Sequence, residues 1–335
     1  MKITFFEVPK KEQPFFLQAF SDADVSFFEE KLNEKNVNLA EDSEIISVFV
    51  NSEVSKNIID SFFNLKFIAT RSTGYDHIDI GYCAEKGIKI SNVPAYGSHT
   101  VAEFAFGLML NLSRNILNAS NYVKESSDFN YNSSMEGFDL QNKTLGIIGT
   151  GKIGKNVVKI AKSFEMNVVA YDLYPDLVFA KENNFKYESL LEVLSESDIV
   201  TLHTPYNKEN HHLINKENIS KMKKGIYLIN TARGELIDTE ALIWGLKERI
   251  IAGFGADVLE DERILKNEKT LSTLGSTTEK EKKNVLLNHE LMKMPNVIIT
   301  PHIAFYAREA VAEIFKTTLE NIKGFISGNL KNLIK

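Results

Sequence analysis

Cysteine and long apolar runs are scarce in this 335-residue sequence. Cys83 stands alone, which excludes an intrachain disulfide and fits a reducing compartment. The longest apolar stretch that resembles a membrane segment, residues 104–110, is far shorter than the roughly 20 residues that a spanning helix needs. Glu7 and Lys10 interrupt the N-terminal residues, so we find no signal peptide. We therefore expect a cytoplasmic protein that has no membrane partner.

An excess of positive charge is also missing. Lysine and arginine number 39 against 45 aspartate and glutamate, a formal net charge of −6, which argues against nucleic acid or an acidic membrane as partner. The apolar fraction of 43% is instead typical of a globular protein with a sizeable core. At about 150 residues per domain, the length predicts two domains.

Short apolar runs rich in isoleucine and valine recur between helical patterns. Runs of this kind are typical of strands that are buried on both faces of a parallel sheet, and their alternation with helices indicates βαβ units. The sequence therefore predicts an α/β fold with doubly wound parallel sheets. We expect the strands at residues 3–8, 45–50, 67–70, 88–90, 144–148, 168–171, 198–202, 226–229, 251–255 and 297–300.

Helical periodicity is clearest at residues 100–116 and 308–326, where apolar residues recur every three or four positions. Residues 121–140 are polar, and we expect them to form a connection. Residues 263–293 are highly charged, so we expect a solvated excursion over the surface.

A glycine-rich sequence follows one of the expected strands. Gly149, Gly151 and Gly154 form the pattern G-x-G-x-x-G, which is weak evidence alone but here opens an amphipathic helix at Lys152 and Ile153. In a dinucleotide site the first glycine permits the turn, the second lets the backbone approach the pyrophosphate, and the third lets the helix pack on the strand. The helix N-terminus then attracts the phosphates. A glycine-rich turn that binds no ligand is the alternative.

Asp172 ends the next expected strand, 23 residues after Gly149. Its carboxylate can accept hydrogen bonds from the adenosine ribose, and its charge would repel the 2′-phosphate of NADP. This acid favours NAD as the cofactor, although an ordinary polar residue at a strand end is the other interpretation.

Three later strands each lead into a residue suited to chemistry on a 2-keto acid: Arg233, Glu262 and His302. Ligands of open α/β sheets bind at the carboxyl ends of the strands. A planar guanidinium can clamp a carboxylate, an imidazole can supply a proton near neutral pH, and a carboxylate can orient that imidazole. Each residue alone could be structural. Their combination downstream of a dinucleotide site predicts an oxidoreductase.

Motifs along nearly the whole chain resemble the D-2-hydroxyacid dehydrogenase family. They lie at residues 71–76, 92–96, 100–103, 149–154, 202–205, 230–234, 256–262 and 300–304. Within that family the sequence is most similar to fermentative D-lactate dehydrogenases, through residues 49–51, 93–96 and 301–306. The resemblance implies a reversible reduction of pyruvate to D-lactate by NADH.

The resemblance also implies a role for each matching residue. Arg233 would bind the substrate carboxylate and carbonyl, His302 would be the general acid/base, and Glu262 would be the partner of His302. Further substrate contacts would come from the backbone N–H groups of Thr73 and Gly74 and from Tyr96. The nicotinamide ribose would lie along Thr231, Ala232 and Asp257, and the adenosine along His203, Thr204 and Pro205.

Family architecture implies two domains, one inserted into the other. A Rossmann-type cofactor domain at residues 99–300 would be inserted into a flavodoxin-like substrate domain made of residues 1–98 and 301–335. A homodimer or homotetramer is implied as well.

Two other functions stay open. One is a related dehydrogenase for glyoxylate, hydroxypyruvate or a bulkier 2-keto acid, and the other is an NAD-sensing, corepressor-like binding protein without enzymatic activity. We expect no metal site, because the remaining histidines, including the adjacent His211 and His212, show no metal-ligand spacing.

Overall fold

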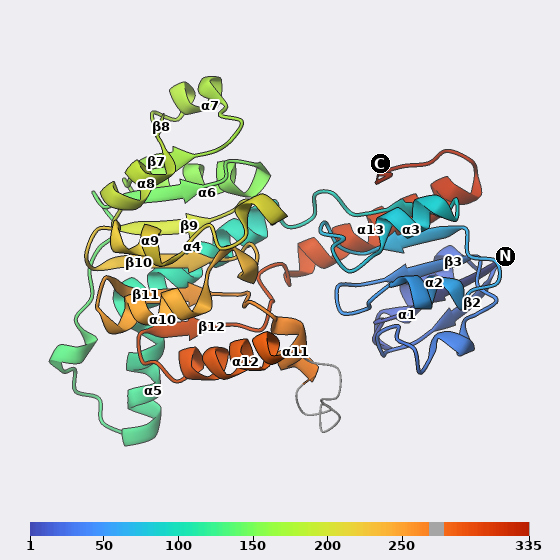
Figure 1. Ribbon diagram of the computed structural model, residues 1–335, viewed down its shortest axis with the longest axis horizontal. Coiled ribbons are helices and arrows are strands. Elements are labelled where there is room, and N and C mark those ends of the chain that lie inside the picture. Colours follow the sequence, from blue (N-terminus) through green and yellow to red (C-terminus); the bar gives the residue numbers. More distant parts are fainter. Residues whose placement is uncertain (268–277, 335) are drawn as a thin grey trace. The chain divides into compact units, whose positions relative to one another are not determined.

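The computed structural model describes residues 1–267 and 278–334 (Figure 1). The chain divides into two compact units: unit 1 combines Met1–Tyr96 with Ala307–Lys335, and unit 2 is Gly97–Tyr306. Unit 2 therefore interrupts unit 1 in the sequence. Residues 301–306, which we expected in the substrate domain, belong to unit 2.

Unit 1 contains a five-stranded parallel sheet in the order β2-β1-β3-β4-β5. This is the flavodoxin-like order that was predicted for the substrate domain. The strands are β1 (Lys2–Phe5), β2 (Asp24–Phe27), β3 (Ile45–Val48), β4 (Phe67–Thr70) and β5 (Lys89–Ser91).

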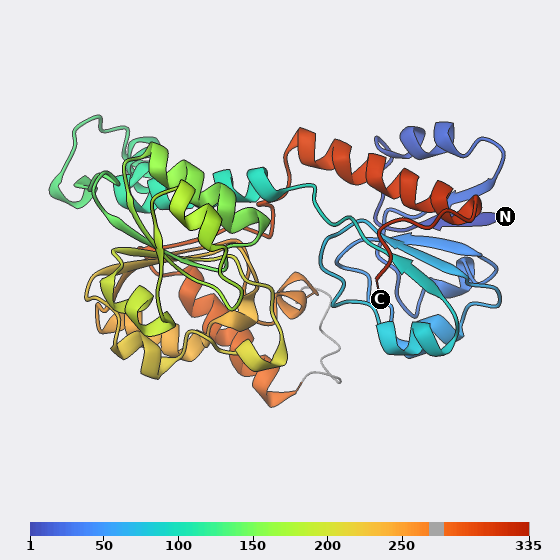
Figure 2. The same ribbon diagram turned by 90° about the horizontal axis from the view of Figure 1, so that it is seen from above.

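Helices cover both faces of this sheet (Figure 2). On one face, α1 (Gln13–Ala19) and α13 (Arg308–Ile326) bury the fully enclosed Phe16 and Ile322 against the strands. On the other face, α2 (Lys56–Asp60) and α3 (Ile80–Glu85) pack through a second apolar cluster. The short helix η1 (Val37–Leu39) lies in the same unit.

Unit 2 contains a seven-stranded parallel sheet in the order β12-β11-β10-β9-β6-β7-β8. The order reverses between β9 and β6, and ligands of open α/β sheets bind beside such a reversal. The strands are β6 (Thr144–Ile148), β7 (Asn167–Tyr171), β8 (Lys186–Tyr187), β9 (Ile199–Leu202), β10 (Ile226–Asn230), β11 (Ile251–Ala256) and β12 (Val297–Ile299).

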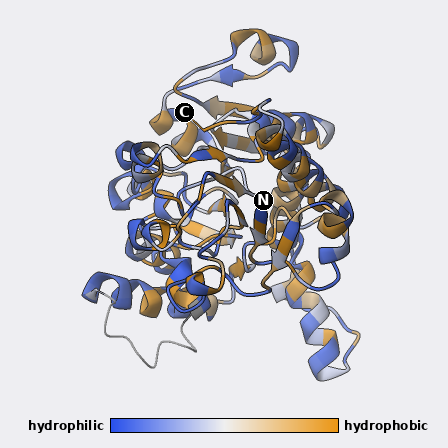
Figure 3. Cartoon of the chain, turned by 90° about the vertical axis from the view of Figure 1, so that its right-hand side faces the viewer, coloured by the Kyte–Doolittle hydropathy of each residue, from blue (hydrophilic) through white to orange (hydrophobic). Residues whose placement is uncertain are grey.

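Two helical layers enclose the unit 2 sheet (Figure 2). One contains α4 (Ser98–Arg114) and α6 (Lys152–Ser163), and the other contains α8 (Leu190–Glu196), α9 (Lys216–Ser220), α10 (Thr239–Lys247) and α12 (Glu279–Met292). Hydrophobic and hydrophilic residues alternate along the chain, and many helices carry both kinds (Figure 3). The other elements are α5 (Ile116–Ser126), α7 (Leu177–Glu182), α11 (Glu262–Asn267), η2 (Ser133–Met135), η3 (Lys208–Asn210) and η4 (Gly234–Leu236).

The predicted α/β class with two parallel sheets is confirmed, and two local predictions are wrong. Residues 121–126 are not a connection: Asn115 adopts a left-handed conformation with φ of 51°, ends α4 and lets α5 begin. Residues 279–292 are not a solvated excursion, because they form α12, whose Leu291 is fully buried in the core. The part of that prediction covering residues 268–277 lies outside the described residues.

The N-terminus of α12 shows why the high charge of residues 263–293 led to a wrong prediction of a solvated excursion. Thr278 and Glu281 form a capping box, in which each side chain binds the backbone N–H of the other. A charged sequence therefore opens a helix whose later residues are apolar enough to pack against α10. None of the helices in the described part of the chain is long and apolar enough to cross a membrane.

Candidate active site

The three residues expected to do chemistry follow three neighbouring strands of unit 2. Arg233 lies just beyond β10, Glu262 beyond β11 and His302 beyond β12, and the strands pair in parallel in that order. Parallel neighbours place their carboxyl ends at one edge of the sheet. The topology thus brings the three segments to one edge.

His302 and Glu262 form a direct charge-assisted pair. Nδ1 of the imidazole lies 2.6 Å from Oε1 of the carboxylate, and both side chains are about three-quarters buried. Because Nδ1 is engaged, Nε2 is the nitrogen left to exchange a proton with a substrate. His302 has a φ of 58°, a left-handed conformation that a residue other than glycine adopts only when its surroundings hold it there.

Asp257 holds that turn. One carboxylate oxygen accepts hydrogen bonds from the Thr300 hydroxyl at 2.5 Å and the Ile303 N–H at 2.9 Å, and the other from the Ala304 N–H at 2.7 Å. Asp257 is only 1% exposed. These bonds make Asp257, which the resemblance places beside the nicotinamide ribose, an internal anchor for the segment that carries His302.

Burial and charge act on these carboxylates in opposite ways. Burial tends to raise the pKa of Glu262, but the hydrogen bond and positive charge of His302, helped by Lys266, outweigh it and lower the pKa to about 2. Burial raises the pKa of Asp257, and the three hydrogen bonds only partly offset this. Glu262 is therefore a carboxylate at any pH where an enzyme would work.

The turn that carries Arg233 is fixed through its backbone. The Asn230 side chain donates to the Arg233 carbonyl at 2.8 Å and accepts from the Ala232 N–H at 3.0 Å. A Cβ added at Gly234 would lie 2.0 Å from the carbonyl carbon of Leu259, so this turn packs directly on the chain that leads to Glu262. Nη1 of Arg233 donates to the Ala232 carbonyl at 2.7 Å.

Glu235, two residues after Arg233, has a side chain that feels the charges of both Arg233 and Glu262, and sequence reasoning missed it. Burial raises the pKa of Glu235, the charges of Glu262 and Asp261 raise it further, and the charge of Arg233 lowers it. Both the arginine and the glutamate are thus within electrostatic range of one side chain. No motif marked this residue, since an acid two positions after an arginine is commonplace.

The glycine-rich loop has the geometry of a phosphate-binding turn. Gly149 has a φ of 92°, and a Cβ there would lie 2.7 Å from the backbone nitrogen of Thr204. A Cβ on Gly154 would lie 2.1 Å from the carbonyl oxygen of Gly149. At Gly151, however, no atom of the described residues would lie within 4 Å of an added Cβ. The first and third glycines are therefore needed for packing, while the second faces open space at the start of α6.

Asp172 ends β7 and binds this loop. One carboxylate oxygen accepts the Thr150 N–H at 2.6 Å and the Thr150 hydroxyl at 2.8 Å, and the other accepts the Tyr174 N–H at 2.9 Å. The Thr150 hydroxyl also bonds the Tyr187 hydroxyl at 2.8 Å. Asp172 thus shapes the loop and presents negative charge beside it. Tyr187 was missed because it lies in the two-residue strand β8.

Two predicted cofactor residues carry buried polar atoms that have no hydrogen-bond partner among the described residues: Nδ1 of His203 and the hydroxyl oxygen of Thr231. Burial lowers the pKa of His203 to about 3, so its imidazole is neutral and shares a hydrogen with the Thr201 hydroxyl at 2.9 Å. Unsatisfied buried polar atoms are costly. These two atoms could bond a polar ligand, such as a dinucleotide, that lies along the carboxyl ends of β9 and β10.

The predicted substrate contacts outside this edge belong to unit 1. The Thr73 hydroxyl donates to the Val93 carbonyl at 2.7 Å, and the Gly74 carbonyl accepts from the Ser72 hydroxyl at 2.6 Å. Tyr96 ends the first segment of unit 1. These local bonds hold the loop after β4 in a defined conformation.

Comparison with known proteins gives a family match over most of unit 2. The model of the D-isomer specific 2-hydroxyacid dehydrogenase, NAD binding domain, matches residues 106–304. This range contains the glycine-rich loop and the segments of Arg233, Glu262 and His302.

Relatives match over most of their length. The D-lactate dehydrogenase of Escherichia coli is 34% identical, over 98% of both chains. An aromatic 2-oxoacid reductase of Clostridium sporogenes is 40% identical, over 88% of this chain and 86% of the reductase. The crystal structure of D-lactate dehydrogenase from Aquifex aeolicus, complexed with NAD and lactic acid, is 39% identical and superposes with a TM-score of 0.87, over 98% of this chain and 96% of that one.

Proposed function

Because the chain belongs to the D-isomer specific 2-hydroxyacid dehydrogenase family and unit 2 is its NAD-binding domain, we propose that it interconverts pyruvate and D-lactate. The observation that carries this proposal is the bonded pair of His302 and Glu262 at the same sheet edge as Arg233. These are the three groups that reduction of a 2-keto acid needs.

In the proposed reaction NADH, when bound, supplies the hydride that reduces the ketone carbon. Nε2 of His302 gives its proton to the carbonyl oxygen, and Glu262 holds Nδ1 and stabilises the protonated ring. The guanidinium of Arg233 binds the substrate carboxylate and polarises the carbonyl. Lactate oxidation runs the same steps backwards, with His302 accepting the hydroxyl proton.

The family resemblance supports further contacts. We assign the backbone N–H groups of Thr73 and Gly74 to the substrate carboxylate, and Tyr96 to the substrate pocket. We assign the pyrophosphate to Gly149, Gly151 and the start of α6 at Lys152, Ile153 and Gly154, where N–H groups lack helical partners. His203, Thr204, Pro205, Thr231, Ala232 and Asp172 are assigned to the rest of NAD.

A bulkier substrate is the second candidate. The aromatic 2-oxoacid reductase, at 40% identity over 88% of this chain, is about as similar in sequence as the D-lactate dehydrogenase from Aquifex aeolicus, at 39% over 98%, and more similar than that of Escherichia coli, at 34% over 98%. The same catalytic groups would serve a 2-keto acid with an aromatic side chain, because they bind only its carboxylate and ketone.

A substrate panel distinguishes the two candidates. NADH oxidation is followed with pyruvate, glyoxylate, hydroxypyruvate and phenylpyruvate, and the product of the best substrate is resolved on a chiral column. We expect pyruvate to give the highest kcat/KM and D-lactate as product. A higher kcat/KM for phenylpyruvate would replace the proposal with the aromatic reductase, and the absence of turnover with all four would favour an NAD-sensing binding protein.

We also propose a cytoplasmic homodimer, in line with the expectation from the family. Light scattering on an eluting size-exclusion peak would give the mass of the assembly. Twice the mass of the chain is expected, and four times would indicate a tetramer.

A further inference from the structure

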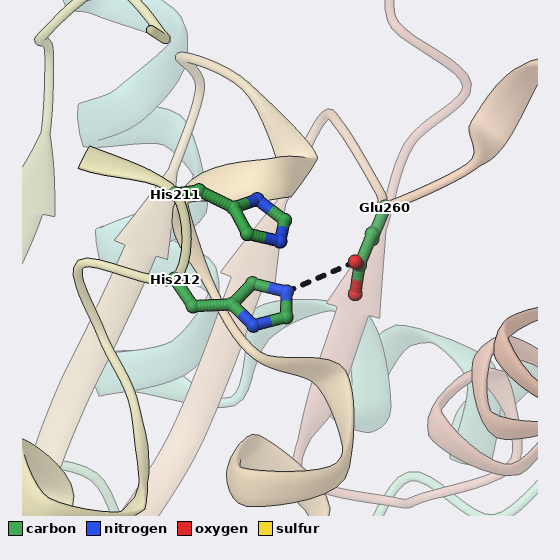
Figure 4. Close-up of side chains that lie close together, drawn as sticks. All are labelled: His211, His212 and Glu260. Atoms are coloured by element: carbon green, nitrogen blue, oxygen red, sulfur yellow. Dashed lines mark hydrogen bonds and ion pairs between the residues drawn. The ribbon is translucent and has the colours of Figure 1, made fainter. Parts of the chain in front are cut away.

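Three polar side chains outside the proposed catalytic groups converge in unit 2: His211, His212 and Glu260 (Figure 4). The histidines follow η3 in the loop after β9, and Glu260 follows β11. Each side chain offers one ligand atom, and these atoms all lie within 4.8 Å of one another. Contraction of that triangle by about an ångström would place all three around one ion.

Backbone conformation explains how adjacent histidines point the same way. His212 has a φ of 53°, in the left-handed region, and the two rings stack with centroids 3.8 Å apart and planes at 24°. Both rings therefore face the Glu260 carboxylate (Figure 4). In an extended strand, neighbouring side chains would point to opposite sides, so the left-handed residue is what lets these adjacent histidines face one carboxylate, which the sequence did not predict.

Glu260 is a fixed and nearly buried acid. It is 5% exposed, and Oε1 lies 2.9 Å from Nε2 of His212, while Oε2 accepts from the Thr239 hydroxyl at 3.1 Å. Its carbonyl accepts from the Asn288 side chain at 2.8 Å. A buried carboxylate aimed at two imidazoles is held in place before any ion arrives.

We propose that His211, His212 and Glu260 bind a divalent transition-metal ion, with Zn²⁺ the best match. Two imidazole nitrogens and one carboxylate oxygen form an established zinc ligand set that leaves a fourth position for water. Asp238 lies on the opposite side of the His212 ring from Glu260: its Oδ2 is 3.9 Å from Nδ1 of His212. At that distance the carboxylate makes no hydrogen bond to the ring, so it supports the site through its negative charge, which attracts a cation.

Neighbouring charges set the conditions for binding. Nζ of Lys280 lies 3.9 Å from Oε1 of Glu260 and competes with the ion. Lys280 is 65% exposed on α12, so it can turn into solvent when the ion binds.

The site lies against the turn that carries Arg233. The His212 N–H donates to the Glu235 carbonyl at 2.9 Å, and Gly234 packs on the backbone between Leu259 and Glu260. An ion bound there would link the loop after β9 to the loop after β11. The inference stands apart from the proposed reaction, because it uses none of the groups assigned to substrate or cofactor.

The test is metal binding by the tag-free, full-length protein after EDTA treatment and removal of the chelator. Zn²⁺ is titrated by calorimetry, and Co²⁺ binding is followed by visible absorption, whose intensity reports low coordination number. We expect one ion per chain. His211→Ala should weaken binding at least about tenfold, and Asp238→Asn, which removes a charge outside the ligand set, should weaken it less.

Two further variants, a control and a ligand substitution, make the test decisive. His99→Ala removes an exposed histidine that pairs with Glu103 at 2.8 Å, so it is the matched control and should bind like the parent protein. Glu260→Gln, checked for folding by thermal unfolding, should also lose binding. Equal Zn²⁺ affinity in the parent protein and His211→Ala would overturn the proposal. So would full affinity in Glu260→Gln, which would indicate only a surface histidine pair.

Discussion

His302 and Glu262 are 40 residues apart in the sequence, and yet Nδ1 of one lies 2.6 Å from Oε1 of the other. The pairing follows from the parallel contact between β11 and β12, which delivers both chain segments to the same edge. Asp257, anchored at the end of β11, then holds the backbone that follows β12. One strand thus supplies both the partner of the histidine and the anchor of its turn.

Glu262→Gln should lower kcat about 10²–10⁴-fold while leaving NADH affinity nearly unchanged. An amide cannot stabilise a protonated imidazole and can favour the wrong tautomer, and comparable changes in other enzymes have effects of this size. Steady-state kinetics and NADH fluorescence titration measure the two quantities. A kcat close to that of the parent protein would show that Glu262 does not assist His302.

The same pair should contribute to stability in a defined pH range. Because the folded-state pKa of Glu262 is lowered from 4.5 to about 2, its contribution is fully present above the unfolded value and is lost as pH falls towards 2. Glu262→Gln should therefore be less stable than the parent protein by about 1–3 kcal/mol near neutrality. Urea unfolding at a series of pH values should show this difference shrinking below about pH 4. A constant difference would contradict the assignment.

Arg233→Lys should reduce kcat/KM by about a hundredfold, because an ammonium group cannot form the two parallel hydrogen bonds of a guanidinium. The control is Arg249→Lys, because Arg249 is exposed and lies in the short connection between α10 and β11. Kinetics with the best keto acid would measure both. Similar losses in the two variants would indicate a general effect of charge or folding.

Alanine substitutions in the glycine-rich loop should separate binding from packing. Gly151→Ala should fold with unchanged stability but bind NADH poorly, because the new methyl enters open space that a phosphate would need. Gly154→Ala should instead lower the melting temperature, since its Cβ would lie 2.1 Å from the Gly149 carbonyl oxygen. Calorimetric unfolding and NADH titration distinguish these outcomes. Tight NADH binding by Gly151→Ala would remove this loop from the cofactor site.

Asp257→Asn should lower kcat through the position of His302. The carboxylate accepts hydrogen bonds from three donors. In the amide, the NH₂ group would face at least one of these donors and could not accept from it, so the turn at 300–304 would loosen. We expect about a tenfold or larger loss of kcat with little change in NADH affinity. Thr300→Val, which removes one of the three bonds, should have a smaller effect. Equal effects of the two variants would argue against the anchor.

Sequence reasoning identified the parallel sheets and their carboxyl edge because both rest on local patterns. The strands β4 and β6 were located to the residue, since each is a short, largely apolar run and the glycine-rich turn follows β6 directly. The strands β2 and β8 were missed. One has an exposed first residue and partly exposed successors, and the other has only two residues, so neither carries a continuous apolar signal.

Features that depend on unusual backbone conformations could not be predicted. The left-handed residue Asn115 lets a second helix, α5, begin where the sequence predicted a connection, and left-handed His212 brings adjacent imidazoles together. The anchoring role of Asp257 depends on contacts with residues more than 40 positions away. Such contacts depend on which strands pair in the sheet, and the local sequence around each residue does not reveal that pairing.

The interrupted chain order of unit 1 has a consequence for biosynthesis. Its first strands bury one face under α13, where fully enclosed Ile322 packs with Ile3 and Phe67, and Ser91 in β5 donates to the Lys331 carbonyl at 2.6 Å. During translation, residues 1–96 therefore leave the ribosome with an apolar face that α1 covers only in part, and α13 follows some 200 residues later. Unit 2 is continuous and can reach its native state first. A nascent chain stalled before α13 would be the species most in need of a chaperone.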